Sequence, residues 1–159
     1  MSKKRGGDDV LHRLRFRVEW SRQRSMWEGT IEQWHEAKSA HHDPSGALSE
    51  IVELARAAIA DNIAPSAVLT HRSREVWHLA HRYGFDDIAV SGLTADREDD
   101  LASRLDLTIE PYRSPADPAM LELQIELARL LGFQVRLHRP QVGRPTVSLN
   151  TFVNNAMHE

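Results

Sequence analysis

The chain has 159 residues, of which 41% are hydrophobic and 27% charged, with no Cys and a net charge of −3. This length and composition predict one sizeable core and disfavour a largely disordered or membrane-spanning protein. The lack of Cys excludes disulfides, thiol nucleophiles and cysteine-type zinc sites. The first ten residues, MSKKRGGDDV, are basic without an apolar run behind them, so we expect no secretory signal, a cytoplasmic location and no membrane partner.

Charge is spread unevenly along the chain. Through Arg24 there are eight basic and three acidic residues, a net of +5 on an acidic remainder. This basic arm is a candidate surface for nucleic acid or for an acidic protein, and a solubilising, partly disordered start is the alternative for Ser2 to Asp9. The arginines that would carry the binding are Arg13, Arg15, Arg17, Arg22 and Arg24.

The next stretch carries three tryptophans. Its start, Leu11 to Trp20, fits either a strand with alternating arginines or the opening of a helix that continues to Ser39. Trp20, Trp27 and Trp34 recur every seven residues with Ile31 on the same side, which is typical of one helix face. Such a stripe must be covered, either by the same molecule or by a partner or second copy.

Further along, the pattern predicts alternating helices and strands. A helix is expected from Ala47 to Ala60, after the break at Pro44 and Gly46. The remaining expected helices are Arg72–Tyr83, Asp96–Arg104 and Met120–Leu131, the last capped by Asp117. The expected strands are Asp87–Ser91, Leu105–Glu110 and Gln134–His138, and Thr146–His158 reads as a weakly helical tail or docking segment.

The strand at Leu105–Glu110 gathers charged residues on one face. Leu105, Leu107 and Ile109 alternate toward the core, so Asp106 must face the other way. In the following strand Arg136 lies on the face from which it would reach Asp106.

Residues 71–139 resemble the minimal nucleotidyltransferases of the DNA polymerase beta-like superfamily. The resemblance lies in the stretches HRSREVWHLAHRYGFDDIAVSGL, RLDLTIE and IELARLLGFQVRLH, and in their spacing. It implies an α+β fold with a small mixed β-sheet and flanking helices. In that family, carboxylates on adjacent strands hold magnesium ions that bridge the triphosphate and activate the attacking hydroxyl.

The residues that carry this chemistry are partly replaced. Gly92 matches the Gly of the family's Gly-Ser turn, and Asp106 matches the second metal-binding Asp. Arg104 stands where the first metal-binding Asp is expected, and Arg136 stands at the position of the third acid. A guanidinium repels a divalent cation and pairs well with a carboxylate. We therefore predict a structural cluster of Arg104 and Arg136 around a vestigial Asp106, with no metal.

Two other interpretations of this cluster stay open. The arginines, with the turn at Gly92, would bind a phosphate or nucleotide directly. Alternatively, an unconventional nucleotidyltransferase, with Mg and ATP as cofactors, would use substitute acids such as Asp99, Asp100 or Glu110.

The expected organisation has three parts. A mainly helical, tryptophan-bearing extension (1–65) precedes a nucleotidyltransferase-like domain (66–140) and a C-terminal tail or docking helix (141–159). The resemblance implies a bacterial, antitoxin-like or regulatory pseudoenzyme without a cofactor, whose partner is a protein such as a HEPN-type toxin, or a second copy. The Arg72 to His78 spacing is itself similar to a HEPN ribonuclease motif, but it is typical of a chance match inside a helix.

Overall fold

The computed structural model describes residues 7–114, 116–141, 143 and 145–157. It divides into two compact units, one formed by Met1–Ala64 with Asp100–Ser103, and the other by Pro65–Asp99 with Arg104–Glu159. Each has its own sheet and helices, so the predicted α+β class is confirmed. In the described part of the chain, no helix combines the length and the apolar character needed to cross a bilayer.

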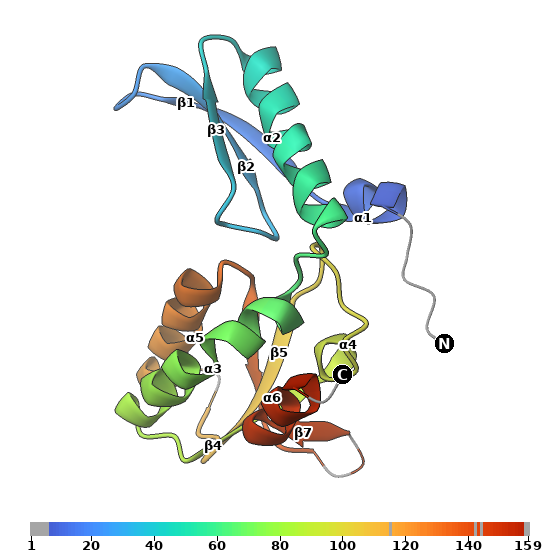
Figure 1. The fold of residues 1–159 in the computed structure, drawn as a ribbon. Coiled ribbons are helices and arrows are strands. Elements are labelled where there is room, and N and C mark those ends of the chain that lie inside the picture. The colour runs from blue at the N-terminus through green and yellow to red at the C-terminus, as the bar shows by residue number, and fades with distance from the viewer. Residues whose placement is uncertain (1–6, 115, 142, 144, 158–159) are drawn as a thin grey trace. The chain divides into compact units, whose positions relative to one another are not determined.

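The first unit is a three-stranded antiparallel sheet covered by one long helix (Figure 1). A short helix α1 (Gly7–Arg13) leads into β1 (Phe16–Ser21), β2 (Met26–Ile31) and β3 (Lys38–His41), in that spatial order. Helix α2 (Pro44–Ala60) begins at Asp43, whose carboxylate accepts a hydrogen bond from the Gly46 amide at 2.7 Å. It buries Ala47, Ile51, Ala55 and Ala58.

The sheet replaces the helix expected through Ser21 to Ser39, so that helix was a wrong prediction, and residues before Pro65 form a sheet as well as helices. Phe16, Val18 and Trp20 alternate with polar residues, and a four-residue loop after Ser21 reverses the chain. The seven-residue spacing of Trp20 and Trp27 therefore reflects a hairpin in which these two residues are cross-strand partners. Strand alternation places Trp20 on the same face as Phe16 and Val18, and the hairpin register places Trp27 opposite Trp20.

The second unit is a four-stranded sheet in the order β6-β5-β4-β7. Strand β4 (Asp87–Ser91) is antiparallel to β5 (Leu105–Glu110) and to β7 (Thr146–Ser148), whereas β5 and β6 (Val135–His138) are parallel. The helices are α3 (Pro65–Arg82), α4 (Gly92–Ala95), α5 (Pro118–Leu131) and α6 (Leu149–Met157). This unit differs from expectation in three places. Helix α3 begins at Pro65 rather than Arg72, residues 96–104 form no helix, and the tail contributes both a strand and a helix.

The core of this unit lies on one face of the sheet. Leu105, Leu107 and Ile109 of β5 point into it, beside alternate residues of β4 and β6. Helices α3, α5 and α6 cover this face with side chains that include Val76, Leu123, Leu127 and Phe152. Side chains at the intervening strand positions must project to the opposite face, and these carry the candidate site.

Candidate functional site

The face of the four-stranded sheet away from the core is polar. The register places Asp106 of β5 beside Ser91 of β4 and beside Arg136 of β6, and it places Thr108 beside Ala89 and His138. On the far side, Thr146 and Ser148 of β7 align with Ser91 and Ala89. Small residues, hydroxyls and charged groups therefore form rows across all four strands.

Asp106 is the centre of this face and is held by two side chains. Arg104 Nε donates to Asp106 Oδ1 at 3.2 Å, and His138 Nε2 lies 2.7 Å from the same oxygen. The side chains of Asp106 and His138 are about four-fifths buried, at 20% and 21% exposure, whereas that of Arg104 is 44% exposed. An ionised carboxylate only accepts hydrogen bonds, so His138 acts as the donor.

The predicted pairing with Arg104 is present, and that with Arg136 is not. Arg136 is aligned with Asp106 but is exposed, and no ion pair joins these two residues. The second partner is His138, which the sequence analysis missed. Alternation along Val135–His138 places His138 on the same face as Arg136. Parallel pairing of this strand with Leu105–Glu110 then brings His138 near Asp106, and that pairing is the signal from which the contact could have been predicted.

Gly92 stands next to this carboxylate. It follows the last residue of β4, has φ +69°, and a Cβ built on it would lie 3.8 Å from Asp106 Oδ2. Such a φ favours glycine. The Gly turn and the remaining acid are thus neighbours, and the hydroxyl of Ser91 donates to the backbone oxygen of Asp106 at 3.3 Å.

The three substitute acids lie elsewhere. Asp99 accepts hydrogen bonds from the backbone amide and the hydroxyl of Ser66, at 2.7 and 2.6 Å. Asp100 belongs to the other unit. Glu110 is on the same strand face as Asp106 but four residues away, about 13 Å along a strand. Within the described residues, no group of three or more His, Cys, Asp or Glu side chains is arranged to hold a metal ion.

A groove of about 330 Å³ adjoins the site on the polar face. Its floor includes Thr108, two residues along β5 from Asp106, and the loop after β6 contributes Pro140 and Gln141. Its other side chains come from β4, β5 and β7: Asp87, Ile88, Ala89, Glu110, Thr146 and Ser148. Polar and apolar surface contribute about equally to the lining, and its polar side chains are hydroxyls, carboxylates and one amide, without Lys, Arg or His among the described residues.

The basic arm is largely neutralised within its own unit. Arg15 pairs with Glu32 at 3.7 Å, Arg17 with Glu19 at 3.7 Å, and Arg24 with Glu28 at 3.6 Å. Arg22 is exposed and has no ion pair among the described residues. A row of paired arginines releases few counterions, so this surface is poorly suited to a phosphate backbone.

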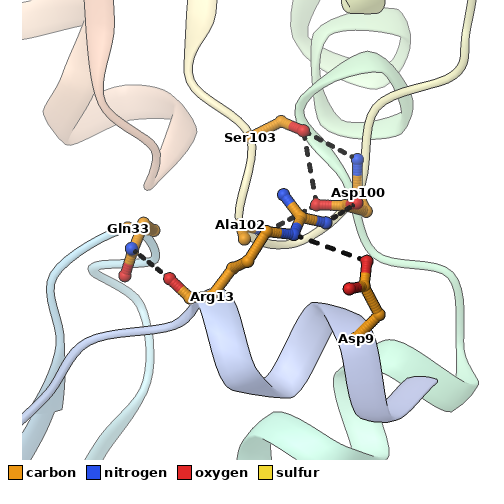
Figure 2. A network of polar contacts seen from close by, with 6 residues as sticks. All are labelled: Asp9, Arg13, Gln33, Asp100, Ala102 and Ser103. Atoms are coloured by element: carbon orange, nitrogen blue, oxygen red, sulfur yellow. Dashed lines mark hydrogen bonds and ion pairs between the residues drawn. The ribbon is translucent and has the colours of Figure 1, made fainter. Parts of the chain in front are cut away.

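Arg13 is the most enclosed member of the arm. Its guanidinium donates to the carboxylate of Asp100 and also lies 3.7 Å from Asp9 (Figure 2). Asp100 in turn accepts from the Ala102 amide at 3.0 Å and from the Ser103 hydroxyl at 3.3 Å. Arg13 therefore fastens residues 100–103 to α1 rather than presenting a charge to a ligand.

The predicted tryptophan interface is only partly exposed. Ile31 is 1% exposed and belongs to the core, and Trp27 and Trp34 are half-buried. Trp20 is 49% exposed, and its ring meets that of Trp27 edge to face at 5.5 Å between centroids. Of the four residues expected to contact a partner, Trp20 has the most surface available.

Comparison with known proteins gives no relative. No protein-family model matches the chain, and no curated protein or solved structure is significantly similar to it.

Proposed function

We propose that the unit of Pro65–Asp99 and Arg104–Glu159 is a degenerate nucleotidyltransferase-like domain that transfers no nucleotide and acts by binding a protein partner. The observation that carries the proposal is the occupation of Asp106 Oδ1 by Arg104 and His138. A guanidinium keeps its proton at every relevant pH and repels divalent cations. Magnesium would have to displace these donors from Oδ1, and at Oδ2 of the same carboxylate it would still lie close to the repelling guanidinium.

The surroundings of Asp106 support the nucleotidyltransferase-like part of the proposal. The strand with the acid lies between β4 and β6, and Gly92, which directly follows β4, lies beside the acid. Arg104 precedes Asp106 by two residues, the position from which a first metal-binding acid would project to the same face. Helices α3, α5 and α6 pack on the core face, which leaves the polar face with its groove as the surface that a substrate or partner would meet.

The partner half of the proposal rests on the groove beside Asp106. Among its apolar side chains, the described part of its lining has three hydroxyls, the Gln141 amide and two carboxylates, which give directional hydrogen bonds rather than a cationic cradle for a triphosphate. Such a surface fits a polar protein segment, and the resemblance implies a HEPN-type toxin in an antitoxin-like or regulatory pair.

Calorimetry with magnesium and ATP tests the proposal that this domain transfers no nucleotide, because a transferase must bind both. The natural chain should bind neither, and Arg104→Asp, which restores acids at positions i and i+2, should gain Mg²⁺ or Mn²⁺ binding at the site. Arg72→Asp, at an exposed arginine paired with Glu75, is the matched control and should gain none. Magnesium-dependent nucleotide transfer by the natural chain, abolished in Asp106→Asn, would instead show an active enzyme.

A further inference from the structure

Strand β1 is an open edge of the three-stranded sheet. It pairs with β2 only, so one side of Phe16–Ser21 lacks a strand partner in the described part of the chain. Natural sheets protect such edges with Pro, bulges, very short strands or charged side chains. This strand is six residues long, has no Pro and pairs with β2 over its whole length without a bulge. Its two charges, Arg17 and Glu19, are of opposite sign, so they repel a second copy only in some registers.

The hydrogen-bond pattern shows which residues face the open side. The amide of Glu32 donates to the Arg15 carbonyl at 2.9 Å, so the backbone N–H and C=O of Arg15 point toward the β2 side. Hydrogen-bonded and non-hydrogen-bonded pairs alternate in an antiparallel ladder. The backbone groups of Arg17, Glu19 and Ser21 therefore also point toward β2. The backbone groups of Phe16, Val18 and Trp20 point to the open edge.

We propose that two copies of this chain associate through β1, antiparallel and two-fold symmetric about Val18. In this register Val18 faces Val18 of the second copy, and Phe16 faces Trp20. All three residues have outward backbone groups, so the pairs that meet are the ones able to exchange hydrogen bonds. A two-fold axis through Val18 makes each contact occur twice.

Charge complementarity selects this register. Arg17 and Glu19 lie on the face opposite to α2, where they form an exposed ion pair at 3.7 Å within one chain. In the dimer Arg17 also meets Glu19 of the second copy, and Glu19 meets its Arg17, so the four side chains alternate in charge. Moving the two-fold axis by one residue, to Arg17 or to Glu19, would place Arg17 against Arg17 or Glu19 against Glu19. Like charges directly opposed across strands are destabilising. Of these three arrangements, only the one centred on Val18 places opposite charges across from each other while the outward backbone groups are aligned for hydrogen bonding.

The apolar face of the strand fits the same arrangement. Trp20 is 49% exposed although it lies on the face that carries Gly29 and Ile31 against α2. Phe16 of the second copy would cover it, and aromatic cross-strand pairs are among the favourable ones in sheets. Two three-stranded sheets would become one six-stranded sheet, with both α2 helices on the same face. This inference does not depend on the function proposed for the other unit.

Sedimentation of charge variants tests the proposal. The natural chain should be dimeric at about 100 µM, where an association of ordinary strength is saturated. Arg17→Glu and Glu19→Arg should each weaken self-association by about tenfold or more, because each opposes like charges twice. An equimolar mixture of the two variants should form a heterodimer, since each then meets its opposite. A monomeric natural chain, unaffected single variants or a mixture that stays monomeric would overturn the proposal.

A backbone variant tests the edge itself. Val18→Pro removes an amide that points away from β2, so the hairpin should keep its own hydrogen bonds. The variant should be folded by circular dichroism and monomeric by sedimentation. In the natural chain the Val18 amide should exchange slowly with solvent when dimeric and faster on dilution. A folded Val18→Pro variant that still dimerises would overturn the assignment to β1.

Discussion

The guanidinium of Arg13 donates a hydrogen bond to the carboxylate of Asp100, 87 residues further along the chain. The segment Asp100–Ser103 belongs to the first unit, although the chain on both sides of it belongs to the second. The two side chains are 34% and 19% exposed, less than those of most ion pairs in this protein. A long-range bond of this kind is expected to matter more than the exposed pairs around it.

A double-mutant cycle on Arg13→Ala and Asp100→Ala should give a coupling free energy of about 1–3 kcal/mol in urea unfolding, since a hydrogen bond between charged groups is lost. The matched control is the pair Arg56 and Glu53 on α2, with side chains 61% and 73% exposed. Its coupling should not exceed about 0.5 kcal/mol. Equal coupling in the two cycles would show that Arg13 is an ordinary surface charge.

The pH dependence of stability should reveal the cap of α2. Hydrogen bonds from the Ser45 hydroxyl and the Gly46 amide, with a contribution from His41, hold the pKa of Asp43 below its ordinary value of 3.8. A depressed folded-state pKa gives stability that is present above 3.8 and lost as the pH falls through the lower value. Asp43→Ala should therefore be less stable than the natural chain at pH 7, and the difference should shrink in acid.

Asp43→Asn separates the cap from the charge. Asn caps helices about as well as Asp but does not titrate, so this variant should keep most of the stability at pH 7. Its free energy of unfolding relative to Asp43→Ala should not change between pH 7 and pH 2. A difference that vanished in acid for the Asn variant too would assign the pH dependence to another group.

Gly29 is the position in the first sheet where a side chain has least room. A Cβ there would lie 2.4 Å from Ser39 Oγ and 2.9 Å from the Ala47 backbone oxygen. Gly29→Ala should therefore lower the free energy of unfolding by about 1–3 kcal/mol, the usual cost of overpacking a core. Gly7→Ala is the control, because its Cβ would make an ordinary 3.4 Å contact with Ile59. Comparable stability of the two variants would contradict this close packing of α2 on β2.

The elements with a complete local signal were predictable from sequence. Helix α5 has Asp117 as its cap and Gly132 in a left-handed conformation at its end, and the expected boundaries match within two residues. The strands at Asp87–Ser91 and Leu105–Glu110 were predicted by alternation and bounding turns. In these segments the local sequence and the tertiary structure favour the same conformation.

Other features depended on contacts that the local pattern does not contain. The spacing of Trp20 and Trp27 fits a helix as well as a hairpin, and pairing with β2 decides between them. The helix expected after Asp96 is absent because Arg97 adopts φ +57°, which ends the turn of α4. His138 joins Asp106 only through the parallel register of β5 and β6. The register between two strands that are distant in the sequence cannot be predicted from the sequence of either strand alone.

Arg97 should hold α6 in place on α3. Its Nη2 donates to the Phe152 carbonyl at 2.8 Å, its Nη1 donates to Thr70 at 3.2 Å, and the guanidinium lies 4.0 Å from the Phe152 ring centroid. Arg97→Ala removes all three contacts, at an expected cost of about 2–4 kcal/mol from the charged hydrogen bonds and the cation–π contact. The left-handed backbone would persist, because Ala relieves none of its strain.

Comparison with Arg97→Gly separates the side chain from the backbone. Gly loses the same contacts but adopts φ +57° freely, so it should be more stable than the Ala variant by about 1 kcal/mol. In both variants the amides of α6 should exchange faster than those of α5. Arg129→Ala, which removes an exposed pair with Glu126, should leave exchange in α6 unchanged. Unaltered exchange in α6 in the Arg97 variants would mean that Phe152 and its apolar neighbours hold this helix without the arginine.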